Sequence, residues 1–220
     1  MKLFLDTANI DEIRHGVEMG VVAGVTTNPS LAANEGVCDL LAYGDAVRQI
    51  ADIVQGPVSA EVFSNDAASM IDQGRIIATW AGNVVVKLPS TTDGFKAMAI
   101  LSREGIPINQ TLCFSVNQAL LGVQAGTTYV SPFVGRIDDT GTDGMALVRD
   151  IVDIFSKQGI AVKVLAASLR HPLHVVQAAK IGAHCATIPY KVLLQMAKHP
   201  LTDAGVVKFE QDLIAVSASR

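Results

Sequence analysis

One short unit recurs along the whole chain, and it constrains the fold more than any other feature. In each unit a helix-like stretch ends at a glycine, and a short apolar run follows at once. Glycine is favoured there because it reaches the left-handed conformation that closes a helix. The seven glycines are Gly20, Gly56, Gly82, Gly105, Gly126, Gly159 and Gly182. The runs that follow them are 21–25, 57–63, 83–88, 107–113, 128–133, 161–167 and 184–188, and an eighth run, 2–5, opens the chain.

Between these runs the apolar residues recur with a helical period, and typical helix starts precede them. Thr142 and Asp143 precede a predicted helix over 143–158, and residues 90–93 open another after Pro89. Strands separated by helices pair in parallel, because a parallel crossover needs a helix-length connection. Eight units in 220 residues, about 27 residues each, predict a (β/α)8 TIM barrel as a single domain over 1–220. The alternative is a doubly wound open sheet, which usually carries a glycine-rich phosphate loop after its first strand; neither GxGxxG nor GxxxxGK[ST] occurs here.

An additional helix is predicted near the end of the chain, over 203–217. Five apolar residues recur in it: Val206, Val207, Phe209, Leu213 and Ile214. A helix this apolar needs a partner surface. We expect it to dock either on its own barrel or on a neighbouring subunit.

Composition excludes several classes of partner and location. The net charge is −4 with no basic run, which argues against nucleic acid and anionic membranes. No apolar stretch approaches the ~18 residues of a membrane span, and Asp6 comes too early for a signal peptide. Cys38, Cys113 and Cys185 lie far apart without a CxxC pair, so we expect buried thiols in a reducing compartment. We therefore expect a cytoplasmic protein.

Polar side chains stand at the carboxyl ends of seven of the eight predicted strands. In a TIM barrel these ends and the loops after them carry the reacting groups. Buried ionisable residues are rare unless they are paired. Asp6, Glu61 and Lys87 converging on one barrel mouth therefore predict a site there. The strand-end residues, in chain order, are Asp6, Thr26, Thr27, Asn28, Glu61, Lys87, Asn109, Thr111, Ser131, Ser168 and Arg170.

Lys87 is the residue that most strongly indicates a reactive group in this sequence. The run VVVKLP over 84–89 buries its amine among aliphatic side chains, which disfavours the charged form. A neutral amine is the form that attacks a carbonyl to make a Schiff base. The alternative is a structural lysine paired with Glu61. Lys163 is predicted near the bottom of the barrel and Lys191 in the solvated first turn of the eighth helix, so neither matches this position.

A Schiff-base enzyme also needs proton carriers. Asp6 and Glu61 are the carboxylates at the same rim, and Thr111 is placed to hold a water between them and Lys87. The structural alternatives are that Asp6 caps the following helix and that Glu61 is only a counter-ion to Lys87.

We expect Arg136, Ser168 and Arg170 to bind phosphate, because guanidinium groups match phosphate oxygens. The alternative for Arg136 is surface pairing with Asp138 or Asp139.

Metal sites are weakly indicated. Residues 139–144 resemble a calcium loop only in part, because their third position is glycine. His171 and His174 fall on one helix face, but no third ligand and no HExxH are present. We expect no metal and no cofactor.

The motifs at these strand ends resemble the short transaldolase family, which includes the fructose-6-phosphate aldolases. The resemblance covers essentially the whole chain and rests on several motifs in the correct order. Gln110 departs from it, because relatives often have an aliphatic residue there; we expect this side chain to point away from the site. The motifs are LDTA (5–8), GVTTNPS (24–30), VVKLP (85–89), IPINQT (106–111), SPFVGRI (131–137), AASLR (166–170) and HPLTD (199–203).

The resemblance implies a reaction and roles for individual residues. It implies Schiff-base transfer of a dihydroxyacetone unit from sedoheptulose 7-phosphate to glyceraldehyde 3-phosphate, giving erythrose 4-phosphate and fructose 6-phosphate, in the non-oxidative pentose phosphate pathway. Lys87 would carry the Schiff base, Asp6 would take the C4 hydroxyl proton, and Glu61 with Thr111 would handle the catalytic water. The remaining groups would bind substrate: Thr26, Asn28, Asn109, Ser131 and Phe133 around the dihydroxyacetone unit, and Arg136, Ser168 and Arg170 at the phosphate.

The resemblance leaves a lyase as the alternative function. Fructose-6-phosphate aldolases have glutamine and tyrosine where this chain has Glu61 and Phe133, which favours the transferase. A non-catalytic sugar-phosphate-binding protein is the alternative from another class. Family members of this length resemble decamers of two pentameric rings, with the last helix docked on a neighbour, so we expect a homo-oligomer.

Overall fold

Eight parallel strands form a closed barrel in the computed structural model, which describes residues 1–37 and 39–218. Neighbours in sequence pair throughout, and the last strand pairs with the first, Lys2 beside Cys185 and Leu5 beside Ile188. The sheet therefore closes, and the predicted TIM barrel is confirmed rather than the open sheet. The strands are β1 (Lys2–Asp6), β2 (Gly24–Thr26), β3 (Val58–Glu61), β4 (Val84–Pro89), β5 (Ile108–Cys113), β6 (Tyr129–Pro132), β7 (Lys163–Ala166) and β8 (Cys185–Ile188).

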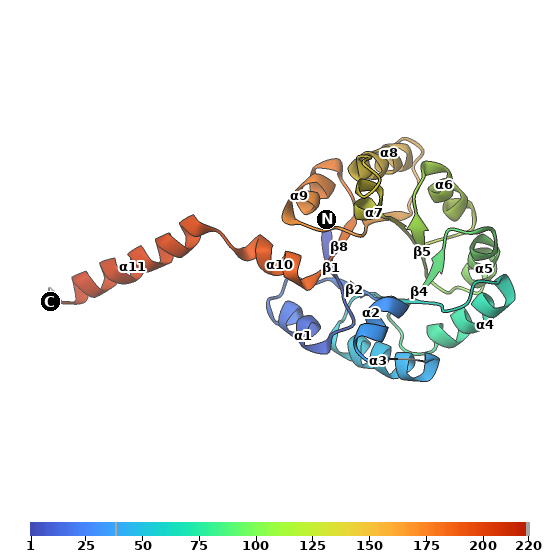
Figure 1. The fold of residues 1–220 in the computed structure, drawn as a ribbon, viewed down its shortest axis with the longest axis horizontal. Helices are drawn as coiled ribbons and strands as arrows, with labels where there is room; N and C mark the ends of the chain where they lie inside the picture. Colours follow the sequence, from blue (N-terminus) through green and yellow to red (C-terminus); the bar gives the residue numbers. More distant parts are fainter. Residues whose placement is uncertain (38, 219–220) are drawn as a thin grey trace.

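Helices surround the barrel as a ring, which Figure 1 shows end-on. Two short helices that the sequence did not predict, α2 and α7, follow β2 and β6 at the site end. They extend the loops after those strands without changing the alternation of strand and helix. The helices are α1 (Ile10–Glu18), α2 (Pro29–Asn34), α3 (Leu40–Ile53), α4 (Ala67–Ala78), α5 (Thr92–Arg103), α6 (Val116–Gln124), α7 (Val134–Asp138), α8 (Gly144–Lys157), α9 (Pro172–Ile181), α10 (Tyr190–Ala197) and α11 (Pro200–Ala218).

The glycines before the strands have two different reasons to be glycine. Gly20, Gly105, Gly126, Gly159 and Gly182 have positive φ angles, as the helix-closing role requires. Gly56 and Gly82 do not, so the prediction was wrong for these two. At Gly56 a Cβ atom would lie 1.9 Å from the carbonyl oxygen of Ala23, so close backbone approach excludes a side chain. Nothing in the structure explains Gly82.

Side-chain caps start the helices soon after the strands end. Asn9 accepts hydrogen bonds from the backbone of residues 11 and 12, so Asn9, not Asp6, caps α1. The capping alternative for Asp6 is therefore wrong, and its carboxylate stays available to the site. Thr91 caps α5 and Asp143 caps α8, both within the predicted start signals. These short strand-to-helix turns keep the polar strand ends together at one end of the barrel.

The last helix, α11, extends away from the barrel (Figure 1). It begins at Pro200, three residues before its predicted start, and its apolar side chains lie in solvent; Phe209 is 73% and Leu213 69% exposed. It therefore does not dock on its own barrel. Among residues 1–37 and 39–218, no helix combines the length and apolar character needed to cross a membrane. Cys113 and Cys185 are buried free thiols, and Cys38 lies outside the described residues.

Candidate active site

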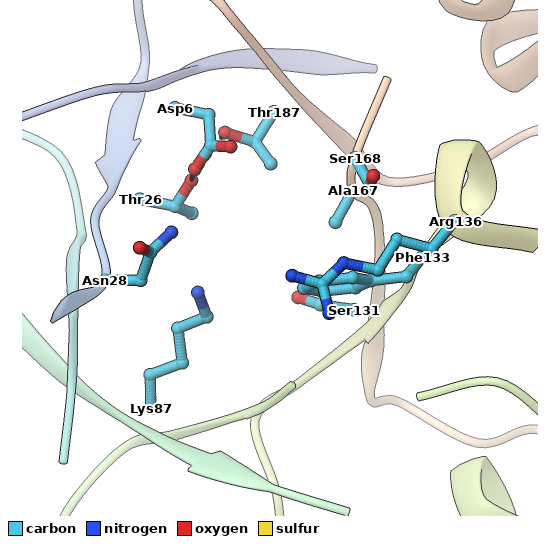
Figure 2. A pocket seen from close by; sticks show the side chains of 10 residues that line it. All are labelled: Asp6, Thr26, Asn28, Lys87, Ser131, Phe133, Arg136, Ala167, Ser168 and Thr187. Carbon is cyan, nitrogen blue, oxygen red and sulfur yellow. Dashed lines mark hydrogen bonds between the residues drawn. The ribbon is translucent and has the colours of Figure 1, made fainter. Parts of the chain in front are cut away.

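A cavity of about 130 Å³ opens at the carboxyl ends of the strands. Figure 2 shows Lys87 extending its amine into this cavity from one wall, with the Arg136 guanidinium on the opposite side. Ten residues line it, contributed by β1, β2, β4, β6 and β8, by helix α7 and by the loops that follow the strands. They are Asp6, Thr26, Asn28, Lys87, Ser131, Phe133, Arg136, Ala167, Ser168 and Thr187.

Lys87 lies on β4 with only 4% of its surface exposed. Its ammonium Nζ lies 2.9 Å from Glu61 Oε2 and donates a hydrogen bond to the carbonyl oxygen of Thr27 at 3.3 Å. The register of β3 and β4 places Glu61 directly beside Lys87, so the pair is built into the sheet. Glu61 is thus the nearest acceptor for a proton from the Lys87 amine.

Asp6 ends β1 and accepts a hydrogen bond from the Thr26 hydroxyl at 2.7 Å. Burial raises the pKa of Asp6 above its usual value, while the Lys87 charge and the Thr26 hydrogen bond oppose that rise and Glu61 adds to it. A raised pKa makes a carboxylate a stronger base. Asp6 is therefore suited to accept a proton from a substrate hydroxyl.

Thr187 lines the cavity and was not among the residues predicted from the sequence. Its hydroxyl lies 2.7 Å from that of Thr26, so Asp6, Thr26 and Thr187 form a continuous hydrogen-bonded chain across β1, β2 and β8. Thr187 is the polar residue at the end of the eighth strand, the one strand for which no strand-end candidate was assigned. The sequence did contain an indication of this position, because Thr187 is a polar residue within the apolar run 184–188.

Asn109 lies behind the cavity wall rather than on it. It is fully buried; its amide Nδ2 donates to Ser59 Oγ at 3.0 Å, and its Oδ1 accepts from Ser131 Oγ at 2.6 Å. Ser131 itself reaches the cavity. Asn109 therefore fixes the orientation of Ser131.

Thr111 and Gln110 point in different directions from the same strand. Thr111 is fully buried, and its hydroxyl has no hydrogen-bond partner among the described residues. Gln110 donates its amide to Ser90 Oγ at 2.9 Å and to the carbonyl of Gln118 at 2.8 Å, toward α6. The expectation that Gln110 points away from the site is confirmed. Thr111 does not line the cavity, so its predicted role stays a prediction.

The opposite wall combines an aromatic ring, a cation and a strained loop. The Arg136 guanidinium lies 5.4 Å from the centroid of the Phe133 ring, and both residues line the cavity. Arg136 makes no ion pair with Asp138 or Asp139, so the surface-pairing alternative is wrong. Ser168 has a φ of 58°, a conformation rare for a residue with a side chain. Strain of this kind is common at ligand sites.

Arg170 lies apart from the other predicted phosphate ligands. Its guanidinium makes a two-point ion pair with the Asp139 carboxylate and is about half exposed. The structure therefore brings Arg136 and Ser168 to the cavity but leaves Arg170 engaged at the rim. At Gly135 a Cβ atom would lie 2.4 Å from the Ser168 carbonyl oxygen, so a side chain there would push the two loops apart.

Tyr43 supports the site from a helix and was also missed. Its hydroxyl accepts a hydrogen bond from the backbone N–H of Glu61 at 3.2 Å, and burial raises its pKa. Its ring packs against Trp80 and Phe63. In the sequence it belongs to the apolar stripe of α3 and cannot be distinguished from an ordinary core residue.

The two other candidate lysines lie where the sequence predicts. Lys163 begins β7 at the opposite end of the barrel, and Lys191 is exposed in the first turn of α10. Neither lines the cavity around Lys87.

Comparison with known proteins supports the same grouping. Residues 3–219 match the family model described as Transaldolase/Fructose-6-phosphate aldolase. The chain is 56% identical to a "Probable transaldolase" of Dehalococcoides mccartyi over 96% of this chain and 97% of that one. It is 53% identical to a "Probable transaldolase" of Geobacillus thermodenitrificans over 96% and 98% of the two chains.

A solved structure shows the same fold at low sequence similarity. It is a thiamine phosphate pyrophosphorylase from Pyrococcus furiosus, which superposes with a TM-score of 0.59 at 15% identity and covers 86% of this chain and 85% of that one. This likeness concerns the barrel alone. The family model and the relatives extend over nearly the whole sequence, strand-end motifs included, and the chain belongs to the transaldolase/fructose-6-phosphate aldolase family.

Proposed function

We propose that this chain is a transaldolase that carries a dihydroxyacetone unit on Lys87. In the reaction, sedoheptulose 7-phosphate and glyceraldehyde 3-phosphate give erythrose 4-phosphate and fructose 6-phosphate, a step of the non-oxidative pentose phosphate pathway. The relatives named "Probable transaldolase" support this activity. The observation that carries it is the buried Lys87 amine at the barrel mouth, within 2.9 Å of a carboxylate.

The first half of the reaction uses Lys87 and Glu61. Lys87 passes a proton to Glu61, and the neutral amine adds to the ketone carbon of the donor sugar. The resulting carbinolamine loses its hydroxyl as water, with Glu61 returning the proton, to leave a Schiff base. Thr111, whose buried hydroxyl is unpaired among the described residues, would hold that water.

The second half uses Asp6. Asp6 takes the proton of the C4 hydroxyl while the C3–C4 bond breaks, and the bonding electrons move into the Schiff base to give an enamine. The shortened sugar leaves as an aldehyde. The enamine then adds to the acceptor aldehyde, Asp6 returns its proton to the new hydroxyl, and hydrolysis frees Lys87. The raised pKa of Asp6 suits both directions of this transfer.

Substrate orientation divides between the two walls of the cavity. Asn28, Thr26 and Ser131 would bind the hydroxyls of the dihydroxyacetone unit, with Asn109 holding Ser131. Arg136 and Ser168 would bind the phosphate. Arg170 would join them only after its ion pair with Asp139 rearranges.

Transfer rather than release of dihydroxyacetone is supported by Phe133. The enamine must be kept from protons until an acceptor arrives. Phe133 lines the cavity without a hydroxyl, so it can neither donate a proton nor orient a water there. Fructose-6-phosphate aldolase activity is the alternative.

We also propose that the chain forms a homo-oligomer through α11. Seven large apolar side chains of this helix are exposed, each by half or more. An isolated apolar helix is marginal in water, so a neighbouring copy would cover it. The seven exposed apolar residues of α11 are Leu201, Val206, Val207, Phe209, Leu213, Ile214 and Val216.

The phosphorylated substrates and the buried free thiols Cys113 and Cys185 support a cytoplasmic location.

Borohydride trapping tests the assignment of Lys87. Incubation with fructose 6-phosphate and borohydride should fix a dihydroxyacetone-derived mass on one tryptic peptide, the one containing residue 87. Lys87→Ala should abolish trapping and activity, whereas Lys191→Ala should retain both. Trapping in Lys87→Ala would overturn the assignment. A coupled assay with and without glyceraldehyde 3-phosphate then separates transferase from lyase.

A further inference from the structure

A second cavity lies at the opposite end of the barrel from Lys87. It has a volume of about 460 Å³ and opens among the amino ends of β1, β6, β7 and β8. Volumes of this size are typical of small-molecule sites. Nothing in the proposed reaction uses this end of the molecule, which in TIM barrels ordinarily serves stability.

The floor of this cavity is apolar and aromatic. Phe4, Tyr129 and Cys185 are all at most 7% exposed and belong to one cluster of buried side chains inside the barrel. The Phe4 and Tyr129 rings meet edge to face with centroids 6.4 Å apart. Such a floor fits an aromatic or aliphatic body rather than a hydrated ion.

The rim of the cavity carries positive charge. Lys2 and Lys163 line it, and neither makes an ion pair with any residue that the structure describes. Lys163 Nζ lies 5.4 Å from the centroid of the Tyr129 ring, which holds the ammonium over the floor. Of the residues that the structure describes, none that lines the cavity carries a carboxylate side chain. In a protein of net charge −4, uncompensated cations gathered at one cavity point to an anion.

His184 adds a hydrogen-bond donor at the same rim. Its Nδ1 accepts a hydrogen bond from the backbone N–H of Val164 at 3.1 Å, so in the neutral ring the proton lies on Nε2. Burial lowers the pKa of His184, and the neighbouring Lys163 lowers it further. Burial and Lys163 therefore disfavour a positive charge on the ring, so His184 contributes a neutral N–H donor at the rim that Lys2 and Lys163 line.

We propose that this cavity binds a small organic anion, in which one carboxylate or phosphate group is attached to an aromatic or aliphatic body. The head group lies among Lys2, Lys163 and His184, and the body lies on Phe4, Tyr129 and Cys185. The cavity is thus a second ligand site, separated from the Lys87 site by the packed interior of the barrel.

Ligand binding can be tested with phenyl phosphate and benzoate as probes, followed by calorimetry and by the NMR signals of the His184 ring. Inorganic phosphate and benzyl alcohol are the matched half-ligands. Either organic anion should shift the His184 signals, and both half-ligands should bind at least about tenfold more weakly. The probe that binds more tightly identifies the head group. Equal binding of inorganic phosphate, or no shift with either anion, would overturn the proposal.

Variants separate this cavity from the active site. The double change Lys2→Gln with Lys163→Gln should weaken binding at least about tenfold, because both charged contacts are lost. Lys180→Gln changes an exposed lysine of α9 that does not line the cavity, and it should leave binding unchanged. The His184 shift should persist in Arg136→Ala, which removes the proposed active-site phosphate ligand. An equal loss in Lys180→Gln, or loss of the shift in Arg136→Ala, would contradict a specific site here.

Discussion

The ion pair between Lys87 and Glu61 predicts a measurable coupling in stability. The charged atoms are 2.9 Å apart, and the two side chains are 5% and 15% exposed. At an effective dielectric constant of about 20, charges at this distance attract by about 6 kcal/mol, part of which offsets their desolvation. Removing one partner from a buried pair typically costs about 3–5 kcal/mol, because the other charge is left uncompensated.

The loss of stability in Glu61→Gln should lie at the low end of that range, because the amide oxygen can still accept a hydrogen bond from the Lys87 ammonium. We expect a loss of about 3 kcal/mol, which for a chain of this length lowers the melting temperature by about 6–12 °C. Adding Lys87→Met removes the uncompensated charge. The double variant should therefore be more stable than Glu61→Gln alone, within about 1 kcal/mol of the parent.

Urea and thermal unfolding of the four proteins at one fixed concentration complete this double-mutant cycle. The cycle should give a coupling of at least about 3 kcal/mol. Asp45→Asn is the matched control: it breaks the exposed Arg48–Asp45 pair, whose side chains are 48% and 78% exposed, and should change stability little. Additive effects of the Glu61 and Lys87 changes would refute the argument.

Three further predictions concern Asp6, Phe133 and α11. Asp6→Asn should stabilise the fold near pH 7, because burial raises the Asp6 pKa above its ordinary 3.8 and so penalises the ionised form in the folded state. This gain in stability should disappear as the pH falls through the raised folded-state pKa and then below 3.8, where Asp6 is protonated in both states. Activity should be lost at every pH. Urea unfolding at pH 7 and pH 4 measures it, and a less stable Asn variant at pH 7 would count against it. Phe133→Tyr should raise release of dihydroxyacetone from fructose 6-phosphate without an acceptor, because it returns a phenolic donor to the cavity; an unchanged rate in the enzymatic assay of free dihydroxyacetone would argue that Phe133 does not protect the enamine. Deleting residues 203–220 should give smaller assemblies or aggregates by light scattering, and an unchanged assembly would show that α11 does not join subunits.

The barrel was predictable because the apolar runs and the helix-start signals predict the same alternation of strands and helices. The apolar runs mark all eight strands, and Thr91 and Asp143 lie within the predicted helix starts. Strand ends then follow from chain order, which places Asp6, Glu61 and Lys87 at one mouth. The short helices α2 and α7 were missed because each covers only one or two turns, too short for a periodic pattern.

The site was less predictable where a side chain contacts residues that are distant in the sequence. The sequence offered Asp138 and Asp139 as partners for Arg136, yet Arg170 pairs with Asp139 from a loop 31 residues away. Asn109 has the same strand-end signal as Ser131, but its amide is used within the wall. Chain order fixes which residues reach one mouth, whereas side-chain geometry decides which of them reach the cavity.

The pairing of β1 with β8 has a consequence for synthesis of the chain. The Asp6–Thr26–Thr187 hydrogen-bonded chain joins β1 and β2 to β8, which is made much later. At about 5–20 residues per second, β1 waits roughly 10–40 s on the ribosome before β8 exists to pair with it. Throughout that interval the growing sheet keeps two open edges, which are sites for pairing with other chains. Substitutions that slow the last steps of closure should therefore lower the yield of folded protein more than they lower its final stability.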